Sequence, residues 1–379
     1  MPRKRLVLAG IIGRYPVGGV TWCALQYIVG FQQLGYDLFY VEDTGECNFD
    51  PVQNAIATDP AYALGYIRRH LEIVGLEDSW AYVDYQGGYH GKTRAQVVDV
   101  CKGADLMVNL SGGCWMVRPE YEALPKVFID TDPGFTQQAI AEAGEGWYRD
   151  FFAAHDALFT FALRVGRPDC TLAETPFRWH PTIQPVHLDS WPVTPAPRDG
   201  PFTTILSWTT DSFPGIGKGK GDELMRLIAL PERTDERILL AVSGKPPTEL
   251  LEQNGWELTD AVQATIDAEA YRRFIQSSKA ELGFAKAMYV ETRSGWFSDR
   301  TQCYLASGRP ALVRETGFSE LLPVGEGLLS FEDADGILEG LESITADYER
   351  HCRRAQELAH EHFAAEGVLR SLLQTAGLA

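Results

Sequence analysis

Two series of short apolar segments, each alternating with helical patterns, run along this chain, and a proline-rich stretch at residues 191–201 separates them. Such alternation builds parallel sheets, because a crossover helix returns the chain to the same edge and the next strand then runs in the same direction. Proline fixes φ and cannot continue a regular element, so the stretch is typical of a connection between folded units. The pattern predicts two α/β domains joined by a linker.

The first series begins at residues 6–9, where an apolar run is followed by a glycine-rich loop and by a helical pattern from about residue 21 to residue 34. Gly35 comes directly after this pattern and stops the helix. A second apolar run at residues 38–41 completes a strand–helix–strand unit, which predicts a Rossmann-like domain. Later strands are expected at residues 106–110, 127–129 and 157–161.

The pattern restarts after the linker, with strands expected at residues 203–207, 237–242 and 281–284. A charged helical pattern covers residues 346–373. We therefore predict an N-terminal domain over residues 1–191, a linker over 192–201, a C-terminal domain over 202–345 and a helical segment over 346–379.

Composition limits the class of protein. A length of 379 residues fits two domains better than a single core. The net charge of −18 disfavours nucleic acid as a partner. The seven cysteines are scattered without a Cys-x-x-Cys pair, which indicates reduced thiols, and no apolar run approaches the ~20 residues that span a bilayer. We expect a cytoplasmic protein without a transmembrane segment, and a homo-oligomer stays open.

The segment from residue 293 to residue 317 carries the clearest functional signal. Small residues and hydroxyls precede a helical pattern, which is followed by a glycine–proline turn, an apolar strand at residues 311–313 and the turn Glu315-Thr316-Gly317. The free N–H groups and the dipole of a helix N-terminus attract anions, and open α/β sheets bind ligands at the carboxyl ends of strands. A phosphate site beside a hydroxyl-binding acid suggests a sugar attached to a diphosphate.

The same segment resembles the donor-binding segment of GT-B glycosyltransferases, which use nucleotide sugars. The resemblance is carried by a Ser/Gly-rich loop, a helix, Ala-x-Gly-x-Pro at residues 306–310, an apolar strand and an acidic turn. It implies two Rossmann-like domains that face each other across a cleft, with the C-terminal helix crossing back to the first domain. It also implies that the second domain binds a nucleoside-diphosphate sugar, such as a UDP-sugar, and that the first binds the acceptor.

Candidate donor-binding residues lie in this segment and at other strand ends of the second domain. Backbone N–H groups and hydroxyls of residues 294–301 would hold the diphosphate, with Arg300 adding charge-assisted hydrogen bonds, and helix capping is the alternative role for the serines. The glycine-rich loop at residues 208–221 would close over the site through Lys218 or Lys220, or would be only a solvated loop. The candidate donor residues are Ser294, Gly295, Ser298, Arg300, Thr301, Thr316, Gly317, Lys218, Ser243, Lys245, Phe284 and Lys286.

The resemblance assigns the turn at Glu315 to the hydroxyls of the donor sugar. Many retaining relatives carry a second glutamate that binds ribose, and Cys303 stands at that position here, which leaves the stereochemical outcome open. An inverting enzyme needs a base within hydrogen-bond reach of the acceptor hydroxyl. Asp130 and Asp132 follow a predicted strand and join Glu315 as catalytic candidates, while bracing the turn at Pro133 is the alternative role for Asp130.

On the acceptor side, Gly18 and Gly19 precede the first helix and let the backbone approach a ligand, or simply form a tight turn. His180 is a further acceptor-side candidate. The sequence His360-Glu361-His362 lacks the spacing that puts two metal ligands on one helical face. We therefore expect no metal and no cofactor, with the nucleotide sugar serving as co-substrate.

Three other functions fit parts of the pattern. A GT-B-type sugar-nucleotide epimerase or hydrolase would use the same donor site without an acceptor glycan. A non-catalytic relative would bind carbohydrate or nucleotide without turning over a donor. An α/β-hydrolase is the third, because residues 109–113 nearly form the nucleophile elbow around Ser111, with Asn109 in place of the first glycine.

Overall fold

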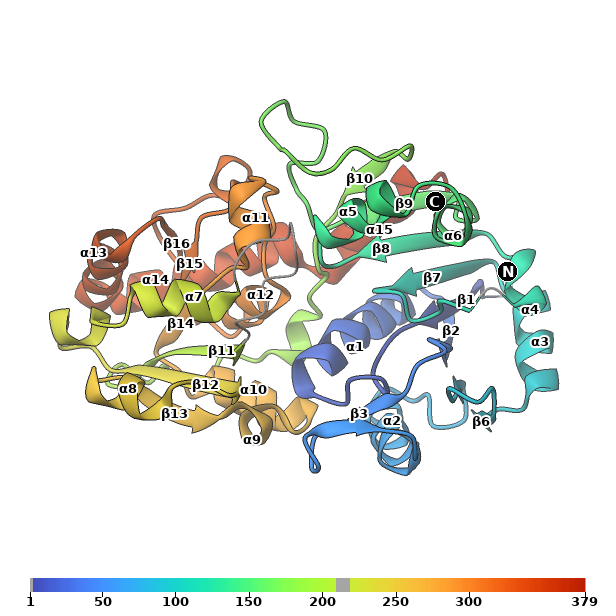
Figure 1. The fold of residues 1–379 in the computed structure, drawn as a ribbon, viewed down its shortest axis with the longest axis horizontal. Coiled ribbons are helices and arrows are strands. Elements are labelled where there is room, and N and C mark those ends of the chain that lie inside the picture. The colour runs from blue at the N-terminus through green and yellow to red at the C-terminus, as the bar shows by residue number, and fades with distance from the viewer. Residues whose placement is uncertain (1–2, 117, 209–218, 379) are drawn as a thin grey trace.

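The computed structural model describes residues 3–116, 118–208 and 219–378. They form two α/β domains that lie side by side, each built on a mainly parallel sheet between helices (Figure 1). Parallel strands need crossover connections, and the helices that provide them cover the sheets. The expected alternation of strands and helices is therefore present in both halves of the chain.

The first sheet has eight strands in the order β10-β9-β8-β7-β1-β2-β5-β6, and β6 pairs with β5 in the antiparallel direction. The strands are β1 (Arg5–Ala9), β2 (Asp37–Glu42), β5 (Trp80–Val83), β6 (Tyr89–Gly91), β7 (Leu106–Leu110), β8 (Lys126–Asp130), β9 (Ala157–Thr160) and β10 (Trp179–Pro181). The helices of this half are α1 (Gly18–Gln33), α2 (Ala61–Ile73), α3 (Arg94–Lys102), α4 (Pro119–Glu122), α5 (Phe135–Ala143) and α6 (Trp147–Ala153). A separate hairpin joins β3 (Asn48–Asp50) to β4 (Ala55–Ala57).

The second sheet has six strands in the order β13-β12-β11-β14-β15-β16, and their pairings are all parallel. The strands are β11 (Phe202–Trp208), β12 (Ile238–Gly244), β13 (Glu257–Asp260), β14 (Ala280–Gly283), β15 (Ala311–Arg314) and β16 (Leu328–Phe331). The helices are α7 (Lys220–Arg226), α8 (Thr248–Gln253), α9 (Ala261–Thr265), α10 (Ala268–Gln276), α11 (Ala287–Glu291), α12 (Asp299–Ala306), α13 (Ala334–Ala346), α14 (Tyr348–Leu358) and α15 (Ala365–Thr375).

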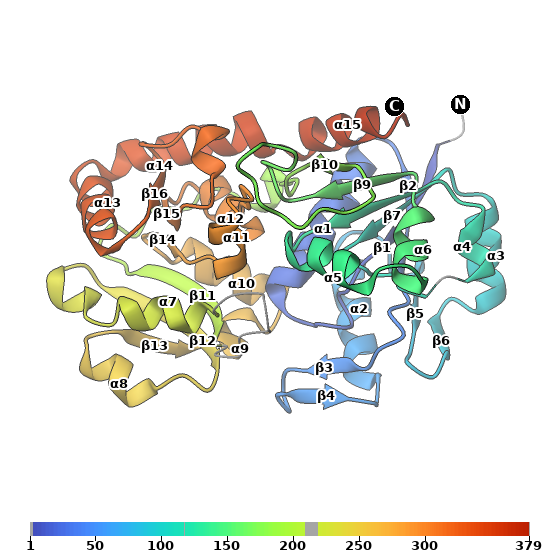
Figure 2. The ribbon, with the colours of Figure 1, turned by 45° about the horizontal axis from the view of Figure 1, so that its top comes forward.

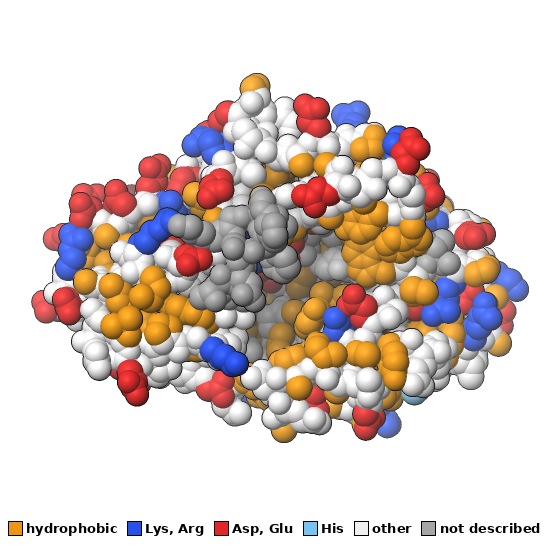
Figure 3. Space-filling view, in the orientation of Figure 1, with side chains coloured by type: hydrophobic (Ala, Val, Ile, Leu, Met, Phe, Trp, Pro, Cys, Tyr) orange, Lys and Arg blue, Asp and Glu red, His pale blue; other side chains and the backbone are white. Residues whose placement is uncertain are grey.

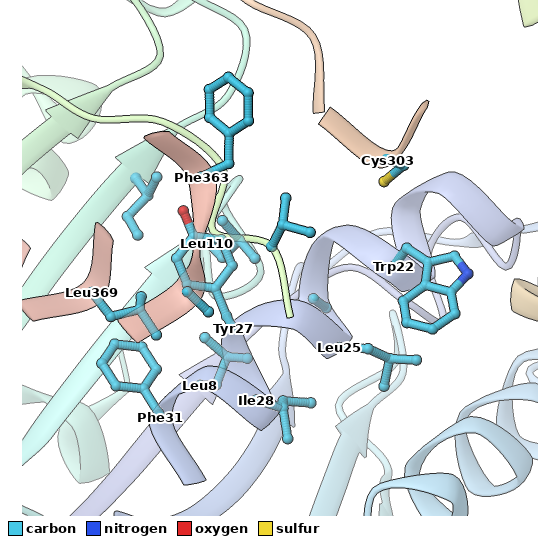
Figure 4. Packing of buried hydrophobic residues seen from close by; sticks show 14 of the residues in the cluster. Leu8, Trp22, Leu25, Tyr27, Ile28, Phe31, Leu110, Cys303, Phe363 and Leu369 are labelled. Carbon is cyan, nitrogen blue, oxygen red and sulfur yellow. The ribbon is translucent and has the colours of Figure 1, made fainter. Parts of the chain in front are cut away.

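The main core of the first domain is built around α1. Figure 4 shows side chains of α1 packed together with Leu8 and Leu110 of the sheet and with Phe363 and Leu369 of the C-terminal segment. A Cβ added at Gly30 would lie only 2.5 Å from Leu369 Cδ1, so a glycine is what lets α15 approach α1. The C-terminal helix thus completes a core that begins with the first strand of the chain.

The chain crosses back to the first domain just before α15. A π-helical turn, Ala359–Phe363, follows α14, and the backbone N–H of Val186 donates to Phe363 O at 2.7 Å. The N–H of Ala365 then donates to Val186 O at 2.9 Å. Figure 2 shows α14 and α15 running along one side of both domains. The expected return of the C-terminal helix is confirmed, and the domain limits at residues 191 and 202 stay predictions.

Candidate active site

A cavity of about 610 Å³ lies between the two domains. It is lined from the first domain by residues that follow β1, β7 and β8 and by the first turns of α1. From the second domain it is lined by the ends of β11 and β12, by the residues after β14 and by the start of α12. The carboxyl ends of both parallel sheets therefore meet at one place, where open α/β sheets bind their ligands.

Three cations from the second domain line this cavity. Lys220 begins α7, Lys286 follows β14, and Arg300 stands in the first turn of α12. Partial burial, together with the charges of Arg300 and Lys286, lowers the pKa of Lys220 to about 7. The cations thus lie close enough to repel one another, and a bound anion would relieve that repulsion.

Arg300 is fixed in place by a buried partner. Its Nε lies 2.7 Å from Oε1 of Glu281 on β14, a residue with no exposed surface, and its Nη1 donates to the backbone oxygen of Ile205. The positive charge of Arg300 is therefore matched by a carboxylate. Arg300 therefore has a structural role in the wall of the cavity besides being one of its cations. The sequence could not show the pairing with Glu281.

Asp132 reaches into the cavity from the loop after β8. Its Oδ1 accepts hydrogen bonds from Lys286 Nζ at 2.6 Å and from the Tyr289 hydroxyl, both from the second domain. Loss of water contact raises the pKa of Asp132, but the charge of Lys286 and the two hydrogen bonds outweigh that effect and hold it below its usual value. Asp132 is thus ionised at neutral pH and joins the two walls.

Asp130 is placed differently, which corrects the prediction that it faces the cleft. Its side chain is buried and accepts hydrogen bonds from Thr136 at 2.7 Å, Gln137 at 3.0 Å and Thr160 at 2.8 Å. Burial raises its pKa, and these three donors oppose the rise. Asp130 therefore braces the loop and the start of α5, which was the alternative role.

The loop before α12 contributes one of its hydroxyls to the cavity. Ser298 lines the cavity and caps α12, since its Oγ accepts from the Arg300 N–H at 3.2 Å. Ser294 and Thr301 are buried, and the Ser294 hydroxyl donates to Tyr289 O at 3.3 Å. Gly295 has a φ of +73° and packs against Arg164 of the first domain. These three residues lie outside the cavity lining, and their predicted contact with a diphosphate stays a prediction.

The turn at Glu315, Thr316 and Gly317 also serves the local structure. The Glu315 carboxylate accepts from the Gly317 N–H, and the Thr316 hydroxyl donates to Trp296 O at 2.7 Å. Gly317 has a φ of +100° and lies against Arg164. These three residues lie outside the cavity lining, so their predicted contact with the donor sugar is not supported by this arrangement.

The other strand-end candidates of the second domain divide into two groups. Ser243 and Lys286 line the cavity, whereas Lys245 is exposed beyond its lining. Phe284 is buried in the core, with its ring centroid 6.0 Å from that of Phe331, so the prediction that it stacks near the base is corrected. Lys218 lies outside the described residues.

The acceptor-side candidates are likewise divided. Gly19 lines the cavity, but Gly18 is packed against the second domain, where an added Cβ would lie 2.4 Å from Asp267 O. His180 lies on the edge strand β10, with its ring centroid 5.6 Å from that of Phe159 and outside the cavity lining. Gly18 therefore allows the two domains to pack closely, and His180 lies outside the candidate site.

Ser111 and Thr131 are polar residues of the first wall that we did not assign to an acceptor site. Their hydroxyl oxygens are 2.8 Å apart, and both residues line the cavity. Ser111 has a φ of +55°, an uncommon value for a residue with a side chain, and such positions concentrate at functional sites. The bonding partner of Ser111 is thus a threonine and not a histidine base, which argues against the α/β-hydrolase alternative.

Within the described residues, no cluster of three or more His, Cys, Asp or Glu side chains is arranged to hold a metal ion. Across the same part of the chain, no helix combines the length and the apolar character that a bilayer crossing requires.

Two Rossmann-like domains around a shared cavity form the arrangement known as the GT-B fold. Residues 226–374 match the model of a family described as "Glycosyl transferase-like". The predicted glycosyltransferase class is thereby confirmed. No protein with a curated description matches the chain.

Solved structures with the same fold span the whole chain. Sucrose-phosphate synthase from Thermosynechococcus elongatus is 12% identical, with a TM-score of 0.56 and 98% of each chain covered. An alpha-glucosyltransferase in complex with UDP is 10% identical, with a TM-score of 0.61, and covers 99% of this chain and 100% of its own. Anabaena HepE, in complex with UDP and glucose, is 12% identical, with a TM-score of 0.59 and 100% of each chain covered. These likenesses confirm the predicted fold.

Proposed function

We propose that this glycosyltransferase binds a nucleoside-diphosphate sugar on the second-domain wall of the cavity and transfers the sugar to an acceptor bound on the first-domain wall. The observation that carries the proposal is the group of Lys220, Lys286 and Arg300 on one wall. A diphosphate is the part of the donor that such a group attracts. The UDP in two of the similar structures makes a UDP-sugar the first donor to test.

Lys220 is the proposed main contact to the leaving diphosphate. Its pKa of about 7 reflects partial burial and two neighbouring cations, so an arriving anion would raise the pKa and fix the charge. Lys286 forms an ion pair with Asp132, and Arg300 forms an ion pair with Glu281, so each of these two cations is partly neutralised. We propose that these protein cations balance the diphosphate without a metal ion.

Asp132 is the proposed base. As the acceptor hydroxyl oxygen attacks the anomeric carbon, a new C–O bond forms and the bond from that carbon to the diphosphate breaks, with its electron pair leaving on phosphate oxygen. The acceptor proton passes to an oxygen of Asp132, which is ionised and lies on the first-domain wall. Ser111 and Thr131 lie on the same wall and position the acceptor hydroxyl.

A donor screen tests this function. Thermal unfolding is followed with UDP-, GDP-, ADP- and dTDP-glucose, because a ligand that binds the native state raises its apparent stability. At least one donor should raise the unfolding temperature, and the Lys220→Met variant should show a smaller rise. Product analysis with donor alone then separates a transferase from an epimerase, which would convert the donor unaided. If no donor binds or is consumed, the proposal is wrong.

A further inference from the structure

The first-domain wall of the cavity is largely apolar. Its side chains include Ile11, Val17, Val20, Phe49, Leu110 and Phe161. Of the lining residues that the structure describes in this domain, Asp132 carries the single charge. No described cation on this wall is available to pair with a phosphate, sulfate or carboxylate of an acceptor.

The loop after β7 connects the cavity lining to a group of aromatic side chains. Ser111 lines the cavity, and Trp115, four residues later, lies at the centre of an aromatic platform made by Trp115, Trp147, Tyr148 and Phe151. The ring centroid of Trp115 is 4.6 Å from that of Phe151 and 5.8 Å from that of Tyr148, with which it stacks. The loop therefore links the cavity directly to the aromatic platform.

The aromatic platform is open to solvent at Trp147, whereas Trp115 and Tyr148 are half-buried and Phe151 is buried beneath them. Trp147 is 56% exposed, and the neighbouring Met116 is 41% exposed. Figure 3 shows hydrophobic side chains gathered beside the hollow between the domains, over the part of the first domain where Figure 1 places β8 and α6. Contiguous exposed apolar surface beside a ligand cavity is typical of a surface that a ligand covers.

We propose that the acceptor is a neutral molecule with a large apolar body that presents a single hydroxyl group to Asp132. Its hydroxyl enters the cavity between Ser111 and Asp132, and its apolar body covers the first-domain wall and the aromatic platform. A strongly hydrated sugar would lose water without gaining polar partners on this wall. A polyanion would be repelled by a net charge of −18. This inference rests on the proposed function, because it names the substrate class of the same site.

The test uses a series of acceptors that share a hydroxyl group. Phenol, 2-naphthol and 4-phenylphenol are compared with glycerol, glucose and a short DNA duplex, with UDP-glucose as donor or whichever glucose donor gives the largest thermal shift. We expect kcat/KM to rise from phenol to 4-phenylphenol and to exceed the values for glucose and DNA. Binding of 4-phenylphenol is measured in parallel by calorimetry in the presence of UDP.

Trp147→Ala tests the aromatic platform, and Tyr85→Ala is the control, because Tyr85 is an exposed aromatic residue of the same domain outside the cavity lining. Loss of one aromatic contact should raise KM for 4-phenylphenol roughly threefold to tenfold with kcat unchanged, and should leave phenol unaffected. Tyr85→Ala should change neither. A circular-dichroism spectrum checks that both variants fold.

Two results would overturn the inference while leaving the proposed function intact: donor binding with preferred transfer to glucose, glycerol or DNA, and donor binding without any calorimetric signal from 4-phenylphenol. Equal KM values for Trp147→Ala and the unchanged chain would also overturn it. Failure of every donor to bind would instead remove the proposed function itself.

Discussion

The two walls of the cavity differ in kind although both are built at the carboxyl ends of parallel strands. The second-domain wall carries Lys220, Lys286 and Arg300 together with one carboxylate, Asp299, whereas the first-domain wall is apolar and carries Asp132 as its described charge. A basic wall suits a charged donor that many reactions share, and an apolar wall suits a specific acceptor. Under the proposed function, the same strand–loop architecture would separate donor recognition from acceptor choice through the side chains that each wall carries.

The largest expected effect comes from the single charge on the apolar wall. Asp132→Asn should lower kcat by about 10²–10⁴-fold, because the amide cannot take the acceptor proton. Steady-state kinetics with the best donor and acceptor measure it. Asp169→Asn is the matched control, since Asp169 also links the domains, through Arg293 at 3.2 Å, and is similarly exposed. Equal losses in both variants would assign Asp132 a bridging role only.

The Arg300→Ala variant should be less stable than the unchanged chain, because the substitution leaves the Glu281 carboxylate buried without its ion-pair partner. The expected loss of unfolding free energy is about 3–5 kcal/mol, measured by urea denaturation. Replacing both partners, as Glu281→Leu with Arg300→Met, should recover much of that stability. Unchanged stability of Arg300→Ala would show that Arg300 is free to serve the donor alone.

Lys220→Met should weaken donor binding by about 1.5–3 kcal/mol, the cost of a lost charge-assisted hydrogen bond. Lys245→Met, from an exposed lysine outside the cavity lining, should bind the donor normally.

The pKa of Lys220 is about 7, so the lysine is charged below that pH and neutral above it. Donor affinity of the unchanged chain should therefore fall as pH rises above about 7.

The Lys220→Met variant should lose that part of the pH dependence, which calorimetric titrations at several pH values would measure. A parallel decline in both proteins would trace the effect to the donor or to another group.

The smallest expected effect concerns the packing of α1 against α10, which brings the two domains into contact. Gly18→Ala should destabilise the chain by about 1–3 kcal/mol, because its Cβ would lie 2.4 Å from Asp267 O and 2.5 Å from Tyr271 Cβ. Gly19→Ala meets the Tyr271 ring only at 3.4 Å and should cost less. Thermal unfolding of the pair measures the difference. Equal stability would show that α1 and α10 adjust freely.

The fold was predictable because its strands are apolar and because glycines and prolines mark the ends of its helices and strands. The runs at residues 6–9 and 106–110 correspond to β1 and β7, and Gly35 follows α1 with a φ of +89°. We did not predict β13, whose residues are only partly buried and lack a continuous apolar run. The hairpin of β3 and β4 was also missed, since three-residue strands leave little periodicity to detect.

The candidate site was predictable in location but less so in detail. Lys286, Ser243 and Asp132 follow strands and reach the cavity as strand-end residues do. Arg300 and Phe284 are equally close to strand or helix ends, but one pairs with Glu281 and the other is buried against Phe331. Which way a loop side chain turns depends on partners from distant segments, and a single sequence does not reveal those pairs.

The two backbone hydrogen bonds that Val186 forms with Phe363 and Ala365 have a mechanical consequence. The polypeptide passes from one lobe to the other and returns at the same spot, so two covalent connections are tied there by backbone hydrogen bonds. A paired attachment of this kind resists sliding and favours pivoting. Opening should then be widest at the far rim, so substrates would enter and products depart on the side opposite the tie.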